Sequence, residues 1–267
     1  MIETLLIFLM GLIVGGLGSM LGIGGGVLLI PLLTAAFGFG IKIAIGTSII
    51  SVIATSSAAG SVYVERGITH NRLAMILETA TTTGALAGGI TAVLINPKIL
   101  SFCFGLVLLY VVYSMRGFRL SESSQLTGTL DTSYRDSLTG EIVNYGVTHL
   151  SKGLGASFLA GNVSGLLGIG GGIIKVPIMN MVMGVPLRAA IATSNFMIGV
   201  TAATSAIIYY WHGYVNPAVA VPTALGVLLG ARIGSVFGAR VRSQRLKQIF
   251  RLILLVFAIQ MFIKAFR

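Results

Sequence analysis

The sequence predicts an all-α integral membrane protein built from two inverted repeats, and three observations favour this fold class. First, 55% of the 267 residues are hydrophobic and only 9% are charged, which is typical of chains that cross a bilayer several times. Second, the chain repeats itself without a gap 146 positions apart, so that Gly22 corresponds to Gly168. Third, each repeat carries one glycine-rich motif within an apolar region, as in transporters with broken helices.

Apolar runs divide each half into five helical segments, of which the second is too short to span a bilayer. In the first half we expect these segments at residues 4–21, 27–37, 43–64, 73–95 and 99–115. In the second half we expect them at residues 147–167, 173–183, 187–211, 218–238 and 249–263. The first run has no basic residues before it and no small-residue cleavage site, which indicates a retained helix rather than a signal peptide.

The repeats also define the domains. We expect a first transmembrane repeat over residues 1–116, a polar linker over 117–146 and a second transmembrane repeat over 147–267. The linker is too short to have a hydrophobic core of its own. Its pattern predicts a small β-hairpin with strands at 134–138 and 141–145.

The glycine motif reads Leu-Gly-Ile-Gly-Gly-Gly at residues 21–26 and again at 167–172. Each glycine lowers helix stability by about 1 kcal/mol relative to alanine, and glycine also permits positive φ angles and close approach of another backbone. One interpretation is a tightly packed helix crossing. The other is a broken helix whose free amide groups face a substrate cavity. Matching copies in two repeats favour the second interpretation.

Loop charge distinguishes two topologies. If each motif lies within a continuous span, the repeats are parallel and the loop cations divide eight to seven between the two sides. If each motif is the tip of a re-entrant hairpin followed by three crossings, the repeats are inverted and the cations divide eleven to four. The positive-inside rule favours the hairpins, with both termini outside and the basic loops and the linker in the cytoplasm. The cytoplasmic cations are then Arg66, Arg72, Arg116, Arg119, Arg135, Lys152, Arg188, Arg240, Arg242, Arg245 and Lys247, against Lys42, Lys98, Lys264 and Arg267 outside.

The two motifs predict an anion-binding site near the middle of the membrane. Helix N-termini with free amides bind anions, and the short segments after the motifs would direct their positive ends toward the membrane centre. Hydroxyl and amide side chains early in the next spans complete the predicted site, although such side chains also commonly join helices within membranes. The predicted substrate-binding residues are Gly24, Gly25, Gly26, Thr47, Ser48, Gly170, Gly171, Gly172, Lys175, Thr193, Ser194 and Asn195.

Few charged residues fall inside apolar segments, where charges are costly and mark functional sites, and Lys175, Arg232 and Glu78 are the candidates among them. Lys175 follows the second motif, and both Lys175 and Arg232 replace leucines of the first half, Leu29 and Leu86. This excess of positive charge favours an anionic substrate. Glu78 is the best intramembrane carboxylate for proton coupling, and Arg232 is a candidate for gating or electrostatic attraction. The alternative for Glu78 and Arg232 is a position near the cytoplasmic interface, which arginine reaches by snorkelling.

Other classes of function have little support. The net charge of +11 would suggest nucleic acid in a soluble protein, but here membrane orientation explains the basic loops. The three histidines lack metal-ligand spacing, and the glycine motif lacks the Gly-Lys-Ser/Thr ending of a phosphate loop. We therefore expect no enzyme, no metal and no cofactor, with a small anion and the lipid bilayer as partners. The hypotheses are a secondary carrier, an anion channel, and a membrane subunit of a larger complex or intramembrane enzyme.

The doubled motif resembles one known family. Leu-Gly-Ile-Gly-Gly-Gly followed five residues later by Pro31 or Pro177, together with Ala-Thr-Ser-Asn-Phe at 192–196, is similar to the sulfite exporter TauE/SafE family of membrane transporters. The resemblance covers nearly the whole chain. It implies export or uptake of small sulfur-containing anions such as sulfite, sulfoacetate or related organosulfonates, in the cell membrane. The first half has Ile49 where the second half has Asn195, so the two half-sites need not contribute equally.

Overall fold

The computed structural model describes residues 2–22, 24–114, 129–135, 140–238 and 244–266. The first half contains α1 (Ile2–Leu21), α2 (Gly26–Ala36), α3 (Ile41–Glu65), α4 (Asn71–Leu94) and α5 (Pro97–Ser114). The second half contains α6 (Leu150–Leu167), α7 (Gly172–Met181), α8 (Leu187–Trp211), α9 (Pro217–Gly238) and α10 (Gln244–Phe266). Between the halves, β1 (Thr129–Arg135) and β2 (Ile142–Val147) form an antiparallel pair.

Six of the helices in the described residues are long and apolar enough to cross a membrane, namely α1, α3, α4, α5, α8 and α9. The central helices α3 and α8 have 25 residues each. At 1.5 Å per residue they reach about 37 Å, which exceeds the ~30 Å hydrocarbon core of a bilayer. The predicted class, a helical multi-pass membrane protein, is confirmed. The re-entrant hairpins and the inverted orientation of the halves stay predictions.

The repeat seen in the sequence recurs in the backbone. The bounds of α3 and α8 are separated by 146 residues at both ends (187 − 41 and 211 − 65). Left-handed glycines recur at the same offset, so the chain turns at matching places in the two halves. These glycines are Gly22 and Gly168, Gly24 and Gly170, Gly25 and Gly171, Gly38 and Gly184, and Gly67 and Gly213.

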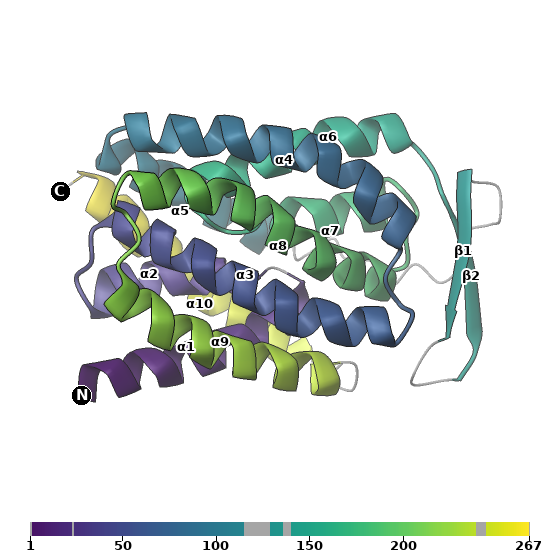
Figure 1. The fold of residues 1–267 in the computed structure, drawn as a ribbon, viewed down its shortest axis with the longest axis horizontal. Helices are drawn as coiled ribbons and strands as arrows, with labels where there is room; N and C mark the ends of the chain where they lie inside the picture. Colours follow the sequence, from purple (N-terminus) through teal and green to yellow (C-terminus); the bar gives the residue numbers. More distant parts are fainter. Residues whose placement is uncertain (1, 23, 115–128, 136–139, 239–243, 267) are drawn as a thin grey trace.

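The two halves pack against each other reciprocally (Figure 1). Helix α1 packs on α9, and its repeat counterpart α6 packs on α4, while α3 lies against α8 and α5 against α10. Small residues allow the close approach, as is usual between membrane helices. A Cβ atom on Gly15 would collide with the backbone of Val227, and one on Gly161 would collide with the backbone of Thr81. The same type of interface therefore forms twice.

The β-hairpin lies beyond one end of the helical bundle, whereas the start of α1 and the end of α10 lie at the opposite end (Figure 1). A hairpin was expected here, but its first strand begins earlier than predicted and ends at Arg135, and residues 136–139 lie outside the described residues. Tyr134 and Tyr145, one on each strand, are buried, and their rings pack edge to face at 6.1 Å. Tyr145 also meets His70 at 5.8 Å, which docks the hairpin beside the start of α4.

Candidate functional site

Each glycine motif interrupts a helix. Residues 22–25 separate α1 from α2, and residues 168–171 separate α6 from α7. Gly25 and Gly171 precede the short helices with φ angles of 73° and 72°, a conformation that is readily available only to glycine. Neither residue supplies a side-chain cap. The amide groups at the starts of α2 and α7 therefore depend on backbone acceptors or on a ligand.

We call residues 22–26 and 168–172 the first and second tips, and residue 23 lies outside the described residues. The tips lie in contact and are joined by matched serines. The Ser48 hydroxyl donates to the Gly168 carbonyl at 2.9 Å, and the Ser194 hydroxyl donates to the Gly22 carbonyl at 3.0 Å. A Cβ atom on Gly172 would collide with the Gly22 carbonyl. Each serine thus closes the tip of the other half, and the contact needs glycine.

The remaining predicted polar residues are buried, and Thr193 faces the start of α4 rather than a tip. The hydroxyl of Thr193 accepts the backbone amide of His70 at 3.0 Å. The side-chain amide of Asn195 donates to the Ser19 carbonyl at 3.2 Å. Two buried atoms of this group, the Thr47 hydroxyl and Asn195 Oδ1, have no hydrogen-bond partner within the described parts of the chain. Such unpaired groups cost about 1–3 kcal/mol each, so their presence at a predicted binding site is informative.

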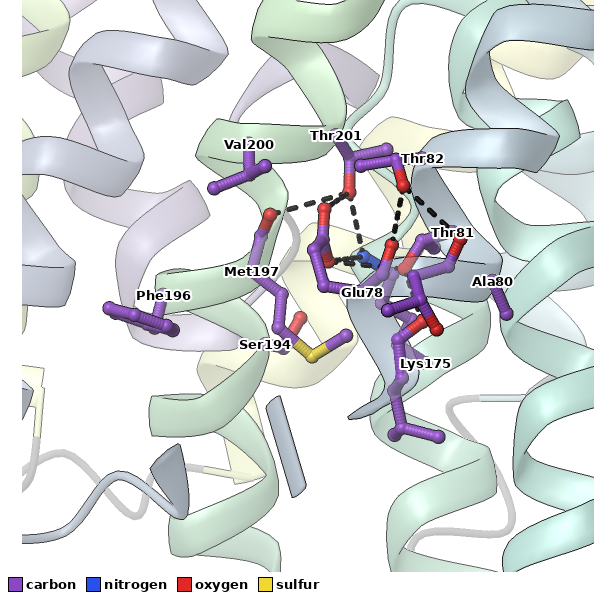
Figure 2. Close-up of polar contacts among 12 residues, drawn as sticks. Glu78, Ala80, Thr81, Thr82, Lys175, Ser194, Phe196, Met197, Val200 and Thr201 are labelled. Atoms are coloured by element: carbon purple, nitrogen blue, oxygen red, sulfur yellow. Dashed lines mark hydrogen bonds and ion pairs between the residues drawn. The ribbon is translucent and has the colours of Figure 1, made fainter. Parts of the chain in front are cut away.

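Lys175, Glu78 and Thr201 form a buried polar group that we call the Lys175 cluster (Figure 2). The Lys175 ammonium lies 3.4 Å from Glu78 Oε2 and donates to the Thr201 hydroxyl at 3.0 Å. The Thr201 hydroxyl in turn donates to Glu78 Oε1 at 2.6 Å, and the Thr81 hydroxyl donates to Glu78 Oε2 at 3.1 Å. The Lys175 side chain is 0% exposed and that of Glu78 is 13% exposed. The cluster joins α4, α7 and α8.

The Lys175 cluster lies next to the tips. A Cβ atom on Gly24 would stand 2.8 Å from Ile198 Cδ1, and one on Gly170 would stand 3.3 Å from Ile198 Cβ. Thr201 follows Ile198 by about one turn of α8. Lys175 is in the first turn of α7, where its amide donates to the carbonyl of the residue before the helix at 3.1 Å. Both short and long helices therefore direct polar groups to one region beside the tip contact.

Arg232 does not join this region. Its side chain is exposed on α9, which agrees with the snorkelling alternative rather than with a role beside the tips. No group of three metal-ligating side chains occurs in the residues that the structure describes. Five of the cations used to predict the topology, Arg116, Arg119, Arg240, Arg242 and Arg267, lie outside those residues.

Sequence reasoning missed Thr201. A signal for it existed, because Thr201 corresponds to Thr55, whose hydroxyl reaches the Gly24 carbonyl at 3.4 Å. A search for hydroxyl side chains that occur at corresponding positions of both repeats would have identified Thr201. The pairing of Lys175 with Glu78 had no comparable signal, since 97 residues separate the two.

Apolar helices of membrane-spanning length, two glycine-broken short helices and a buried ion pair beside the breaks are together typical of a multi-pass membrane transporter. The family model described as "Sulfite exporter TauE/SafE" matches residues 7–261. The chain therefore belongs to the TauE/SafE family of membrane transporters.

Several relatives cover most of the chain. A Bacillus subtilis protein named "Probable membrane transporter protein YunE" is 26% identical over 97% of both chains. A "Probable membrane transporter protein" of Xylella fastidiosa is 28% identical over 93% of this chain and 91% of its own. The Arabidopsis thaliana "Sulfite exporter TauE/SafE family protein 6" is 34% identical, over 32% of this chain and 20% of its own. No solved structure shows significant similarity.

Proposed function

We propose that the protein is a secondary carrier that exports a small sulfur-containing anion, such as sulfite or an organosulfonate, across the cell membrane. The anion binds between the two tips near the bilayer midplane. The observation that carries this proposal is the direct contact of two glycine-broken helices, each closed by a serine of the other half. Opening of this contact would release the serine hydroxyls and the helix N-terminal amides to the anion.

The unpaired side-chain groups support this location. The Thr47 hydroxyl is a donor without an acceptor in the described residues, and an oxyanion placed between the tips supplies acceptors. Asn195 would turn its amide group from the Ser19 carbonyl to the anion. The positive charge of Lys175 beside the second tip adds attraction. The sulfur chemistry of the substrate rests on the family to which the chain belongs.

Alternation between the two sides follows from the predicted inverted repeat. Two equivalent interfaces join the halves in this arrangement. In one, α1 of the first half packs on α9 of the second, and in the other α6 of the second half packs on α4 of the first. Exchange of conformations between equivalent halves opens the site to one side and then to the other. Both termini then face the outside, and the hairpin of β1 and β2 faces the cytoplasm.

Binding measurements on the purified protein test the proposal. A thermal-shift screen of sulfite, sulfate, thiosulfate, sulfonates and carboxylates identifies the best ligand. Because a hydrogen bond to a charged group contributes roughly 1.5–3 kcal/mol, Asn195→Ala should weaken its binding by about 10- to 100-fold, and Ser194→Ala and Lys175→Met should also weaken it. Ser57→Ala, on an exposed face of α3, is the matched control. Unchanged affinity in all three site variants would place the site elsewhere.

An anion channel is the second candidate. A carrier saturates with substrate and exchanges internal for external anion, whereas a channel conducts without exchange. Counterflow in proteoliposomes, in which unlabelled internal anion drives entry of labelled anion, therefore separates the two.

A further inference from the structure

The Lys175 cluster has no charged counterpart in the first half of the chain. Lys175 corresponds to Leu29 and Glu78 corresponds to Ala224. Leu29 is fully buried, so the fold accommodates an apolar side chain at this point of the repeat. Repeat symmetry and packing therefore do not require the ion pair. Charges that a membrane protein retains at such cost mark the paths of substrates and ions.

Lys175 and Glu78 differ in side-chain exposure, and the distance between their charged atoms is long for a strong ion pair. The distance of 3.4 Å between Lys175 Nζ and Glu78 Oε2 exceeds the roughly 2.7–2.9 Å of a strong charge-assisted hydrogen bond. Lys175 is completely buried, whereas Glu78 keeps 13% of its side-chain surface exposed. The carboxylate therefore has surface that a proton donor can contact, and the ammonium has none. A proton can reach Glu78 while Lys175 stays enclosed.

Lys175 is the charged side chain that the described structure brings to Glu78. Elsewhere on α4 and on the helices packed against it, the cations are Arg72, Lys152 and Arg188, each within the first turns of α4, α6 and α8. Arg72 precedes Glu78 by six residues, or about 9 Å along the helix axis. Arg72 and Lys152 are exposed. Protonation of Glu78 would consequently act first on Lys175.

We propose that Glu78 and the transported anion compete for Lys175, which makes the protein a proton–anion symporter that moves one proton with each anion. This inference rests on the proposed function, since it takes the anion to bind beside the tips. While Glu78 is ionised, its carboxylate neutralises Lys175 and excludes the anion. When Glu78 accepts one proton from the open side, the anion takes the place of its carboxylate beside Lys175, so that the ammonium keeps a counter-ion.

The cycle balances in charge and protons. Lys175 stays an ammonium throughout, Glu78 gains a proton on one side and loses it on the other, and a monovalent anion carried with that proton moves no net charge. A metal cation fits the cluster poorly, because the ammonium already stands beside the carboxylate. A proton neutralises the carboxylate without a site of its own. Since both species move in the same direction, an inward proton gradient opposes export, and export proceeds when the outward concentration gradient of the anion exceeds the inward gradient of protons.

Proteoliposomes that hold unlabelled methanesulfonate inside and receive labelled methanesulfonate outside test the inference with two measurements. This anion stays monovalent over the working pH range. Exchange of labelled for unlabelled methanesulfonate at equal pH tests the proposed function alone. An imposed pH gradient, acidic outside, tests coupling. We expect the gradient to concentrate label inside vesicles that hold the wild-type protein. In Glu78→Gln, exchange should become independent of pH and the gradient should drive no accumulation. Glu65→Gln, at the exposed end of α3, is the matched control and should accumulate label like the wild type.

A further measurement needs no variant and so does not depend on how well Glu78→Gln folds. Because one proton binds with each anion, the affinity of the wild-type protein should fall by about tenfold per pH unit on the alkaline side of the titration. Absence of exchange with methanesulfonate, sulfite and sulfoacetate would overturn the proposed function. Exchange without pH-driven accumulation, or accumulation that persists in Glu78→Gln, would overturn the symport inference alone.

Discussion

A lysine that is fully enclosed within an apolar protein keeps its charge only if neighbouring groups replace the water it has lost. Lys175 has two such neighbours, the Glu78 carboxylate and the Thr201 hydroxyl, and Thr201 also binds the carboxylate. Each member of the cluster is a hydrogen-bond or ion-pair partner of the other two. Removal of one member therefore leaves an unpaired buried group, whereas removal of both charges leaves a site like that of the first repeat.

This reasoning predicts a non-additive effect on stability. Loss of one partner from a buried ion pair typically costs about 3–5 kcal/mol, so Lys175→Met should lower the unfolding temperature clearly. Lys175→Met combined with Glu78→Gln should recover most of the loss. Thermal unfolding in detergent provides the measurement, with the exposed Lys152→Met as control. If the effects of the two single changes simply add, the pair contributes no interaction energy.

At the scale of elements, the two tips come into contact at positions where no side chain fits. Gly172 contacts the Gly22 carbonyl too closely for a Cβ atom, and Gly26 lies against Gly168. Glycine is thus needed at these positions for contact between helices as well as for backbone conformation.

We predict that Gly172→Ala separates the tips and reduces transport at least tenfold while the protein still inserts into the membrane. Gly155→Ala is the matched control, since it lies on α6 with no atom within 4 Å of its Cβ position, and it should leave transport intact. Counterflow in proteoliposomes measures both. Wild-type transport by Gly172→Ala would mean that the tips are not part of the pathway.

The hairpin is a second element with a specific dependence on one residue. The Leu73 amide donates to His70 Nδ1 at 3.4 Å, so the ring proton is on Nε2, which lies 3.2 Å from the Leu130 carbonyl. His70 is therefore neutral when the hairpin is docked. Burial lowers the pKa of His70 below its usual 6.5, and the nearby charge of Arg72 lowers it further, whereas the bond to Leu130 acts in the opposite direction.

We predict that acid weakens docking of the hairpin. Because the pKa of docked His70 is below 6.5, the undocked state binds more protons as the pH falls below about 6.5. Docking is fully stable above this pH and loses stability toward the lowered pKa. Hydrogen exchange of β2 amides at pH 8 and pH 5.5, corrected for intrinsic rates, should show greater opening in acid. His70→Gln should remove this dependence, and the exposed His212→Gln should not.

At the scale of the whole molecule, the two halves are related by an offset that holds for helix bounds, left-handed glycines and packing partners. An inverted repeat predicts that counterpart loops face opposite sides of the membrane. The loop after α3 and the loop after α8 are such counterparts.

Cysteine labelling tests the topology. In a background in which Cys103, the single cysteine, is replaced by alanine, Asn71→Cys and His212→Cys place exposed thiols beside these two loops. A membrane-impermeant maleimide applied to intact spheroplasts should label the thiol at 212 and not the thiol at 71. Permeabilised cells, in which both should react, provide the control. Labelling of both thiols in intact cells would make the repeats parallel.

The sequence alone determined the features that depend on neighbouring residues along the chain and on the internal repeat. Apolar length predicted the membrane helices, and glycine clustering predicted the breaks between α1 and α2 and between α6 and α7. The constant offset of 146 residues identified matching serines, which the structure places against opposite tips. These features are readable because helix formation and membrane burial depend on neighbouring residues.

Only the tertiary structure decided which distant polar groups meet. Lys175 and Glu78 belong to different halves and had separate predicted roles, yet packing of α4, α7 and α8 makes them one cluster with Thr201. Arg232 looked similar to Lys175 in sequence, but its face of α9 is exposed. Helical periodicity gives the relative faces of residues on one helix and not the rotation of that helix against its neighbours, which side-chain packing sets.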